Sequence, residues 1–218
     1  MSINNHVIKP KIALFVNHPE CSVDCCNGII RSLSPQYEFK LFTKDYVEDG
    51  FFDDVVLVAF PGGFGDSDRF DRLLEKNKDE VLAFLQRGGH YLGICMGAYW
   101  ADKHYFNILD NVRADQYITR PNTDTHRPHA KAMPVLWNGQ PERMYFYDGC
   151  AMFGGNFETV ATYPNGDAMA IIQGRIGLIG CHPESTPAWY SKNYMKPHWH
   201  EYRHHTLLLE FVNRLLAS

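Results

Sequence analysis

Hydrophobic and polar positions alternate in two ways along the first half of the chain. Short apolar runs typical of buried strands cover residues 11–17, 37–43, 54–60 and 90–94. Segments 22–33 and 70–86 between them repeat their apolar residues at helical spacing, and the second ends at Gly88 and Gly89. This order predicts an α/β fold, with an open, mostly parallel central sheet and helices on both faces.

The second half of the chain has a different pattern. Beyond about Leu109, short apolar segments alternate with turn residues such as those at 164–167. They predict antiparallel additions to the sheet, with strands at 144–147, 158–163, 168–172 and 177–180. A final amphipathic helix is expected at 201–216, docked on the sheet. No linker or repeat divides the chain, so we expect a single domain over residues 1–218.

Composition and charge narrow the function classes. The chain has 45% hydrophobic and 21% charged residues, which is typical of globular proteins. Its net charge is -4, so no cationic excess indicates a nucleic-acid partner. No apolar run approaches the ~20 residues of a membrane span, and the first ten residues lack a signal-peptide core. We therefore expect a cytoplasmic protein without nucleic-acid or membrane partners, whose six cysteines are free thiols.

Cys95 stands in the most informative short motif. It has Gly93 two residues before it and Gly97 two residues after it, between a predicted strand and a predicted helix. Glycines at these positions allow the sharp turn that holds a nucleophile in strained backbone geometry. A helix N-terminus also favours the thiolate, the form that attacks carbonyl carbon. The motif predicts a nucleophilic Cys95, and the alternative is a buried cysteine on a glycine-lined turn.

A base and its orienting group follow another predicted strand. His182 and Glu184 lie two residues apart around Pro183, so an extended chain projects both to the same side. Such a pair suits a general base held by a carboxylate. A surface loop with incidental charges is the alternative for this segment alone.

The glycine-rich segment 61–65 ends the strand at 54–60. Its backbone N–H at Gly63, together with that of Met96, is a candidate oxyanion hole. Gly62, Phe64 and Tyr99 are the candidate substrate-binding residues of the same pocket. A tight turn without a ligand is the alternative.

Four segments together carry a resemblance to a known superfamily. They are VAFPGG at 58–63, GGHYLGICMGAY at 88–99, YFYDG at 145–149 and CHPE at 181–184. In order and spacing the chain resembles the class I glutamine amidotransferase-like superfamily, and within it the family named for the N-terminal domain of biotin-protein ligases. The resemblance implies a flavodoxin-like fold from about Lys11 to the C-terminus. It also implies Cys95 as nucleophile, His182 as base, Glu184 as orienting residue, and the Gly63 and Met96 amides as the oxyanion hole.

The chain departs from the superfamily pattern at Tyr99. True glutamine amidotransferases usually have glutamine at the fourth residue after the nucleophile, where it helps to hold the substrate. A phenol at this place would reshape the pocket floor, which puts glutamine as the substrate in question. We expect no biotin transfer, and any ammonia formed would need a separate acceptor protein.

Two other clusters were considered as metal sites. Cys21, Cys25 and Cys26 lack the spacing of a structural zinc site and fit the core at a helix start. His198, His200, His204 and His205 have no acidic or cysteine partner at ligand spacing, and a polar helix start explains them. Asp66 and Asp68 fit the cap of a helix starting near Arg69.

Three functional hypotheses remain at this point. The leading one is an enzyme without cofactor or metal, which attacks a small-molecule carboxamide or related acyl carbon through a thioester on Cys95. The second is a catalytically silent binding or regulatory module that keeps the fold and the pocket. The third is a metal-dependent enzyme that uses the C-terminal histidines.

Overall fold

Eleven strands form one sheet in the described part of this computed structural model, which comprises residues 9–218. Its main path runs in the order β2-β1-β3-β4-β11-β10-β9-β6-β7, while β8 pairs with both β5 and β10. The strands are β1 (Lys11–Phe15), β2 (Glu38–Phe42), β3 (Val55–Phe60), β4 (His90–Ile94), β5 (Val112–Gln116), β6 (Lys131–Trp137), β7 (Gln140–Phe146), β8 (Cys150–Gly154), β9 (Glu158–Thr162), β10 (Ala168–Gln173) and β11 (Ile176–Ile179).

The sheet has a parallel and an antiparallel part. Strands β2, β1, β3, β4 and β11 are neighbours and all run parallel. From β11 onward, each neighbouring pair along the path is antiparallel. This confirms the predicted α/β fold with parallel strands in the N-terminal half and antiparallel additions later. Because β11 is inserted beside β4, a late part of the chain lies next to residues near position 95.

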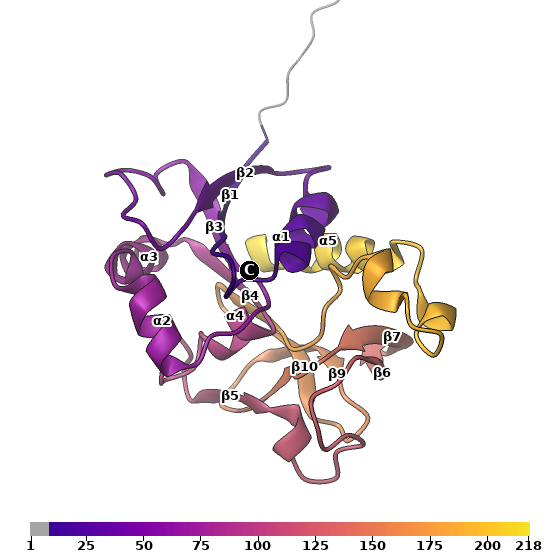
Figure 1. The fold of residues 1–218 in the computed structure, drawn as a ribbon. Helices are drawn as coiled ribbons and strands as arrows, with labels where there is room; N and C mark the ends of the chain where they lie inside the picture. The colour runs from indigo at the N-terminus through magenta and orange to yellow at the C-terminus, as the bar shows by residue number, and fades with distance from the viewer. Residues whose placement is uncertain (1–8) are drawn as a thin grey trace, which may run out of the picture.

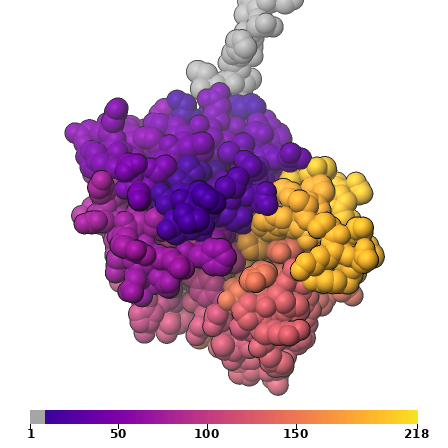
Figure 2. All heavy atoms as spheres, viewed as in Figure 1, coloured from indigo at the N-terminus to yellow at the C-terminus, as the bar shows by residue number. Residues whose placement is uncertain are grey.

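Helices cover both sides of the parallel strands. In Figure 1, α1 and α5 lie side by side on one side, and α2 and α3 lie on the other. Figure 2 shows the C-terminal residues, in yellow, packed against the N-terminal part in indigo. The helices are α1 (Val23–Leu33), α2 (Ser67–Leu74), α3 (Lys78–Gln86), α4 (Met96–Tyr99) and α5 (Arg203–Leu216), with short 3-10 turns η1 (Tyr117–Thr119), η2 (Pro187–Tyr190) and η3 (Lys196–His198).

One hydrophobic core joins the two halves of the chain. It contains fully buried residues from Ile12 in β1 to Leu215 in α5. Aromatic rings add to it, since Phe60 packs against Tyr91 and Trp100 with ring centroids 5.3 and 5.7 Å apart. The single domain over 1–218 stays a prediction, and its residues 1–8 lie outside the described part. None of the helices within residues 9–218 combines the length and apolarity that a bilayer crossing requires.

The predicted helix at 70–86 is two helices. Asp66 caps α2 by accepting a hydrogen bond from the Arg69 amide at 2.9 Å, as expected. The break before α3 is fixed by Asn77, whose buried side chain accepts from the Val47 amide and donates to the carbonyls of Thr43 and Asp45. Apolar spacing continues through the break, so periodicity alone does not reveal it.

Three strands, β5, β6 and β8, were not predicted. Strand β5 reads VRADQ, with Val112 and Ala114 as its two apolar positions, and β6 contains Pro134 in its middle. Strand β6 nevertheless pairs with β7 through Asn138 and Gly139, both at positive φ. Asn-Gly is the favoured sequence of such a tight hairpin turn, and this signal was present in the chain.

Candidate active site

Cys95 occupies a strained turn between β4 and α4. Its φ is 50° and its ψ is -104°, a conformation that residues with a side chain rarely adopt. The Cys95 amide donates to the Ile179 carbonyl at 2.8 Å, and the Cys95 carbonyl accepts from the Ala98 and Tyr99 amides. The helix that follows is one turn long. The sharp turn predicted from the glycine spacing is therefore present.

The two flanking glycines are required by close backbone contacts. A Cβ at Gly93 would lie 2.3 Å from the Gly97 carbonyl oxygen, and one at Gly97 would lie 2.1 Å from that of Phe60. Both distances are far shorter than a van der Waals contact. The glycines thus let β3, β4 and the turn pack together, and this packing holds the Cys95 backbone.

Sheet topology brings His182 to the same edge as Cys95. Strands β4 and β11 are parallel neighbours with Ile94 opposite Ile179, so the residues after both strands emerge together. The His182 amide also donates to the Tyr145 carbonyl at 2.9 Å. No hydrogen bond joins the Cys95 thiol to the His182 ring in the described part of the chain. The two residues are thus at one edge of the sheet without a hydrogen bond between their side chains.

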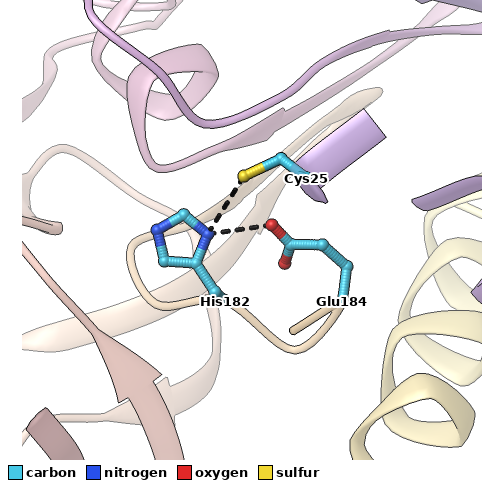
Figure 3. A group of neighbouring side chains, drawn as sticks. All are labelled: Cys25, His182 and Glu184. Carbon is cyan, nitrogen blue, oxygen red and sulfur yellow. Dashed lines mark hydrogen bonds and ion pairs between the residues drawn. The ribbon is translucent and has the colours of Figure 1, made fainter. Parts of the chain in front are cut away.

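Glu184 forms a hydrogen bond to the His182 ring. His182 Nδ1 lies 2.8 Å from Glu184 Oε1, and both side chains are buried. Figure 3 shows that Nδ1 faces Glu184 while the second ring nitrogen points away. The rings of Trp189 and Tyr145 pack against the imidazole at centroid distances of 5.1 and 5.8 Å. These contacts fix the ring and leave Nε2 as the nitrogen available for proton transfer.

The surroundings of His182 favour its protonated form. Burial alone would lower the pKa of His182, but the Glu184 carboxylate, Cys95 and Cys25 together raise this pKa well above its ordinary value. An imidazolium at this place would stabilise a nearby thiolate.

Cys25 is a neighbour of His182 that the sequence did not predict. Its Sγ lies 3.7 Å from His182 Nδ1, on the same side as Glu184 (Figure 3). Burial, with a smaller contribution from Glu184, raises the pKa of Cys25 to about 11. Because Cys25 lies at the start of α1, just after β1, the sequence indicates that it is near the edge of the sheet where Cys95 lies. The sequence does not indicate which side chains of α1 face that edge.

Cys25, His182 and Glu184 are also the one group of three metal-ligating side chains that the described residues bring together. Their ligand atoms all lie within 4.8 Å of one another. Because Nδ1 already bonds to Glu184, an ion there would have to replace that hydrogen bond. The arrangement thus suits an oriented imidazole better than a metal centre.

The two candidate oxyanion donors are unoccupied by protein acceptors. Within residues 9–218, neither the Gly63 nor the Met96 amide donates a hydrogen bond to another protein group. The neighbouring amides at Phe64 and Gly97 are used, since they donate to the carbonyls of Glu20 and Pro61. Gly63 and Met96 both line a pocket that contains Cys95.

That pocket has a volume of about 680 Å³. Tyr99 and Phe64 line it, and their role in substrate binding stays a prediction. The Tyr99 hydroxyl donates to the Asp148 carbonyl at 3.1 Å, so the phenol is fixed, while Phe64 is 67% exposed. Gly62 lies behind the imidazole instead, because a Cβ there would be 2.6 Å from His182 Cε1. Gly62 therefore leaves room for the His182 ring and does not line the pocket.

The remaining clusters have structural contacts. Cys21 and Cys26 are buried in the core, as expected. His200 precedes α5, and its ring stacks on that of His204 at a centroid distance of 3.8 Å. His204 Nε2 bonds to Glu142 at 3.0 Å, and His205 Nε2 bonds to the Ser185 carbonyl at 2.9 Å. These histidines thus anchor the start of α5.

Solved structures of other proteins share this fold. PurLQS from Thermotoga maritima superimposes with a TM-score of 0.65 and 17% identity, covering 95% of this chain and 100% of that one. A glutamine amidotransferase from Thermotoga maritima gives a TM-score of 0.67 and 12% identity, with 95% and 98% covered. The chain therefore has a glutamine amidotransferase-like α/β fold. At these identities the likeness concerns the fold alone.

A known protein family matches part of the sequence. Residues 17–114 match the family described as biotin-protein ligase, N terminal, which confirms the expected family resemblance in a segment of just under half the chain. The match includes Cys25 and Cys95 but ends before His182 and Glu184. No curated protein matches this chain.

Proposed function

We propose that this chain is a glutamine amidotransferase-like hydrolase that cleaves a carboxamide through a thioester on Cys95. The observation that carries the proposal is the strained turn at Cys95 beside β11, the strand that leads to an oriented His182. A nucleophile on such a turn and a buried imidazole held by a carboxylate have the roles of a catalytic triad.

The proposed reaction has two stages. The Cys95 thiolate attacks the amide carbon, and the Gly63 and Met96 amides stabilise the negative charge that develops on the oxygen. The C–N bond then breaks while His182 donates a proton to the leaving nitrogen, which leaves a Cys95 thioester and a free amine or ammonia. Water, deprotonated by His182, attacks the thioester and releases the acid and the thiolate. One amide and one water thus become one acid and one amine.

The proposal includes a cytoplasmic location, a small-molecule substrate and an acceptor for ammonia. All six cysteines are free thiols, which fits the reducing cytoplasm. Ammonia released here would be used by a separate acceptor protein, and we propose a small-molecule amide as the substrate.

A trapping experiment tests the function. The protein is incubated with 6-diazo-5-oxonorleucine, an electrophilic glutamine analogue, and peptides are analysed by mass spectrometry. We expect an adduct on Cys95 that is absent from Cys95→Ser and forms at least about tenfold more slowly in His182→Ala, since removing the base removes typically 10²–10⁴-fold of acid–base catalysis.

The second candidate is a binding module without turnover. Tyr99 at the pocket floor and the missing hydrogen bond between Cys95 and His182 favour it. Folded protein that gives no Cys95 adduct, or an adduct at equal rates with and without His182, would support this candidate against the enzyme.

A further inference from the structure

The pocket over Cys95 has an uneven distribution of charge. Each of its two arginines is paired internally, Arg69 with Asp66 at 3.5 Å and Arg113 with Asp102 at 2.8 Å. Asp148 and Asp115 also line the pocket, and neither forms an ion pair with a cation in the described part of the chain. No lysine lines it. The pocket therefore offers carboxylates without ion-pair partners, has no lysine and no unpaired arginine, and has His104 as its remaining basic side chain.

Asp148 is the carboxylate whose surroundings need a partner most. Its Oδ2 accepts a hydrogen bond from Gln116 Nε2 at 3.0 Å, whereas its Oδ1 is buried without any partner. Burial raises the pKa of Asp148, because removing water destabilises the charged form. A cation placed beside this carboxylate would offset that cost.

The Asp148 backbone is also hydrogen-bonded to α4, the helix that follows Cys95. Its carbonyl accepts from the Tyr99 hydroxyl at 3.1 Å, and the Tyr99 amide donates to the Cys95 carbonyl at 3.1 Å. These hydrogen bonds fix the Asp148 backbone relative to Cys95. Cys95 and Asp148 both line this pocket, so a ligand that fills it lies beside both residues.

We propose that the pocket selects amides carrying a single positively charged primary amine, with Asp148 as the counter-ion of that amine. This inference rests on the proposed function, because it names the substrate class of the Cys95 site. The α-carboxylate of free glutamine is disfavoured beside these carboxylates, so a glutamine analogue should still modify Cys95 but more slowly than an amine without a carboxylate. Asp148 is a specificity residue here and does not take part in bond breaking.

Matched electrophiles test the proposal without knowledge of the natural substrate. Three N-substituted chloroacetamides carry a terminal ammonium, hydroxyl or carboxylate on spacers of two and of four carbons. In each, the Cys95 thiolate forms a C–S bond and chloride leaves, so the chemistry is the same and only the charge differs. Rates of Cys95 modification are measured by mass spectrometry at low salt.

We expect the ammonium probe to modify wild-type Cys95 at least about tenfold faster than the hydroxyl probe, and the carboxylate probe to be the slowest. Asp148→Asn should reduce the preference for the ammonium probe over the hydroxyl probe to within about twofold. Asp71→Asn makes the same charge change on an exposed residue outside the pocket, and should keep the preference.

The outcomes separate the two proposals. Equal rates for the three probes, or a preference that survives in Asp148→Asn, would overturn the selection of amines while leaving the Cys95 nucleophile intact. Faster modification by the carboxylate probe would also overturn it. If no probe modifies Cys95, both the function and this inference are wrong.

Discussion

Gly62 leaves just enough room for the imidazole of His182. A Cβ at this position would lie 2.6 Å from His182 Cε1 and 2.9 Å from Cys25 Sγ. Gly62→Ala should therefore displace the ring and slow Cys95 trapping by about 10- to 100-fold, because small misplacements of catalytic groups are costly. Adding Cys25→Ala removes one of the two clashes and should restore part of the rate. A single variant with the wild-type rate would show that the ring position does not matter.

Cys25 and Cys95 both lie near His182, and only one is proposed as the nucleophile. Cys25 is 1% exposed, and burial raises its pKa to about 11, so it is mostly an unreactive thiol at neutral pH. Cys25→Ala should keep the Cys95 adduct, at no less than about one third of the wild-type trapping rate. Mass spectrometry that finds the adduct on Cys25 in wild-type protein would reverse this assignment.

At this scale the sequence predicted much of the site. The spacing of Gly93, Cys95 and Gly97 predicted the turn, and the spacing of His182 and Glu184 predicted their hydrogen bond. Gly62 was misplaced in the pocket, and the contact of Cys25 was missed. Both errors concern which way a side chain or a helix faces, and a linear spacing does not contain that information.

Among the elements, the break between α2 and α3 depends on Asn77. Its side chain makes three hydrogen bonds to the loop at 43–47 from a fully buried position. Asn77→Ala leaves one buried and two part-buried hydrogen bonds unmade and should lower the free energy of unfolding by about 3 kcal/mol. Urea denaturation measures this, and the exposed Asn27→Ala serves as control, with a change within about 0.5 kcal/mol. Equal effects of the two variants would contradict the role of Asn77.

The start of α5 should make stability depend on pH. Burial lowers the pKa of His200 to about 3 and that of His204 to about 4, against ~6.5 in an unfolded chain. Between about pH 6.5 and 5 the unfolded state thus binds more protons, so the free energy of unfolding falls as the pH falls, by up to about 1.4 kcal/mol per pH unit for each histidine. His182, whose pKa is raised, acts in the opposite direction: around pH 6.5 and above its folded state binds more protons than the unfolded chain, so it adds stability as the pH falls towards 6 and little slope below that.

Urea denaturation at pH 7, 6 and 5 measures this slope. The double variant His200→Asn with His204→Gln should flatten it, even if its stability is lower throughout. His126→Asn, which changes an exposed histidine, should leave the slope as in the wild type. A slope that persists in the double variant would assign the acid sensitivity to other groups.

Elements were predicted best where hydrophobic periodicity was strong. Strands β1, β3 and β4 and the helix α1 were found close to their observed bounds. Strand β6 was not predicted because Pro134 interrupts its apolar pattern. In the structure, pairing with β7 in a hairpin holds this segment extended. The helix break at Asn77 was missed because a tertiary hydrogen-bond network decides it, and this network joins residues about 30 positions apart.

For the whole molecule, the decisive feature is the insertion of β11 beside β4. Alternating strands and helices predicted a parallel sheet, but the order of strands follows from pairings between distant segments, such as 91–94 with 176–179. This pairing places residues 95 and 182 at one edge. The sequence predicted their convergence through family resemblance and the general rule that sites lie at the carboxyl ends of parallel strands.

The most direct test of this account is the pH dependence of Cys95 alkylation by iodoacetamide, measured by mass spectrometry for wild type and His182→Asn. If His182 holds the proton of the thiol, wild-type Cys95 should react at pH 6.5 within about threefold of its rate at pH 9. His182→Asn should react at pH 6.5 about 100-fold more slowly than at pH 9, as an ordinary thiol does. Superimposable profiles of the two proteins would contradict the proposed pairing of Cys95 with His182.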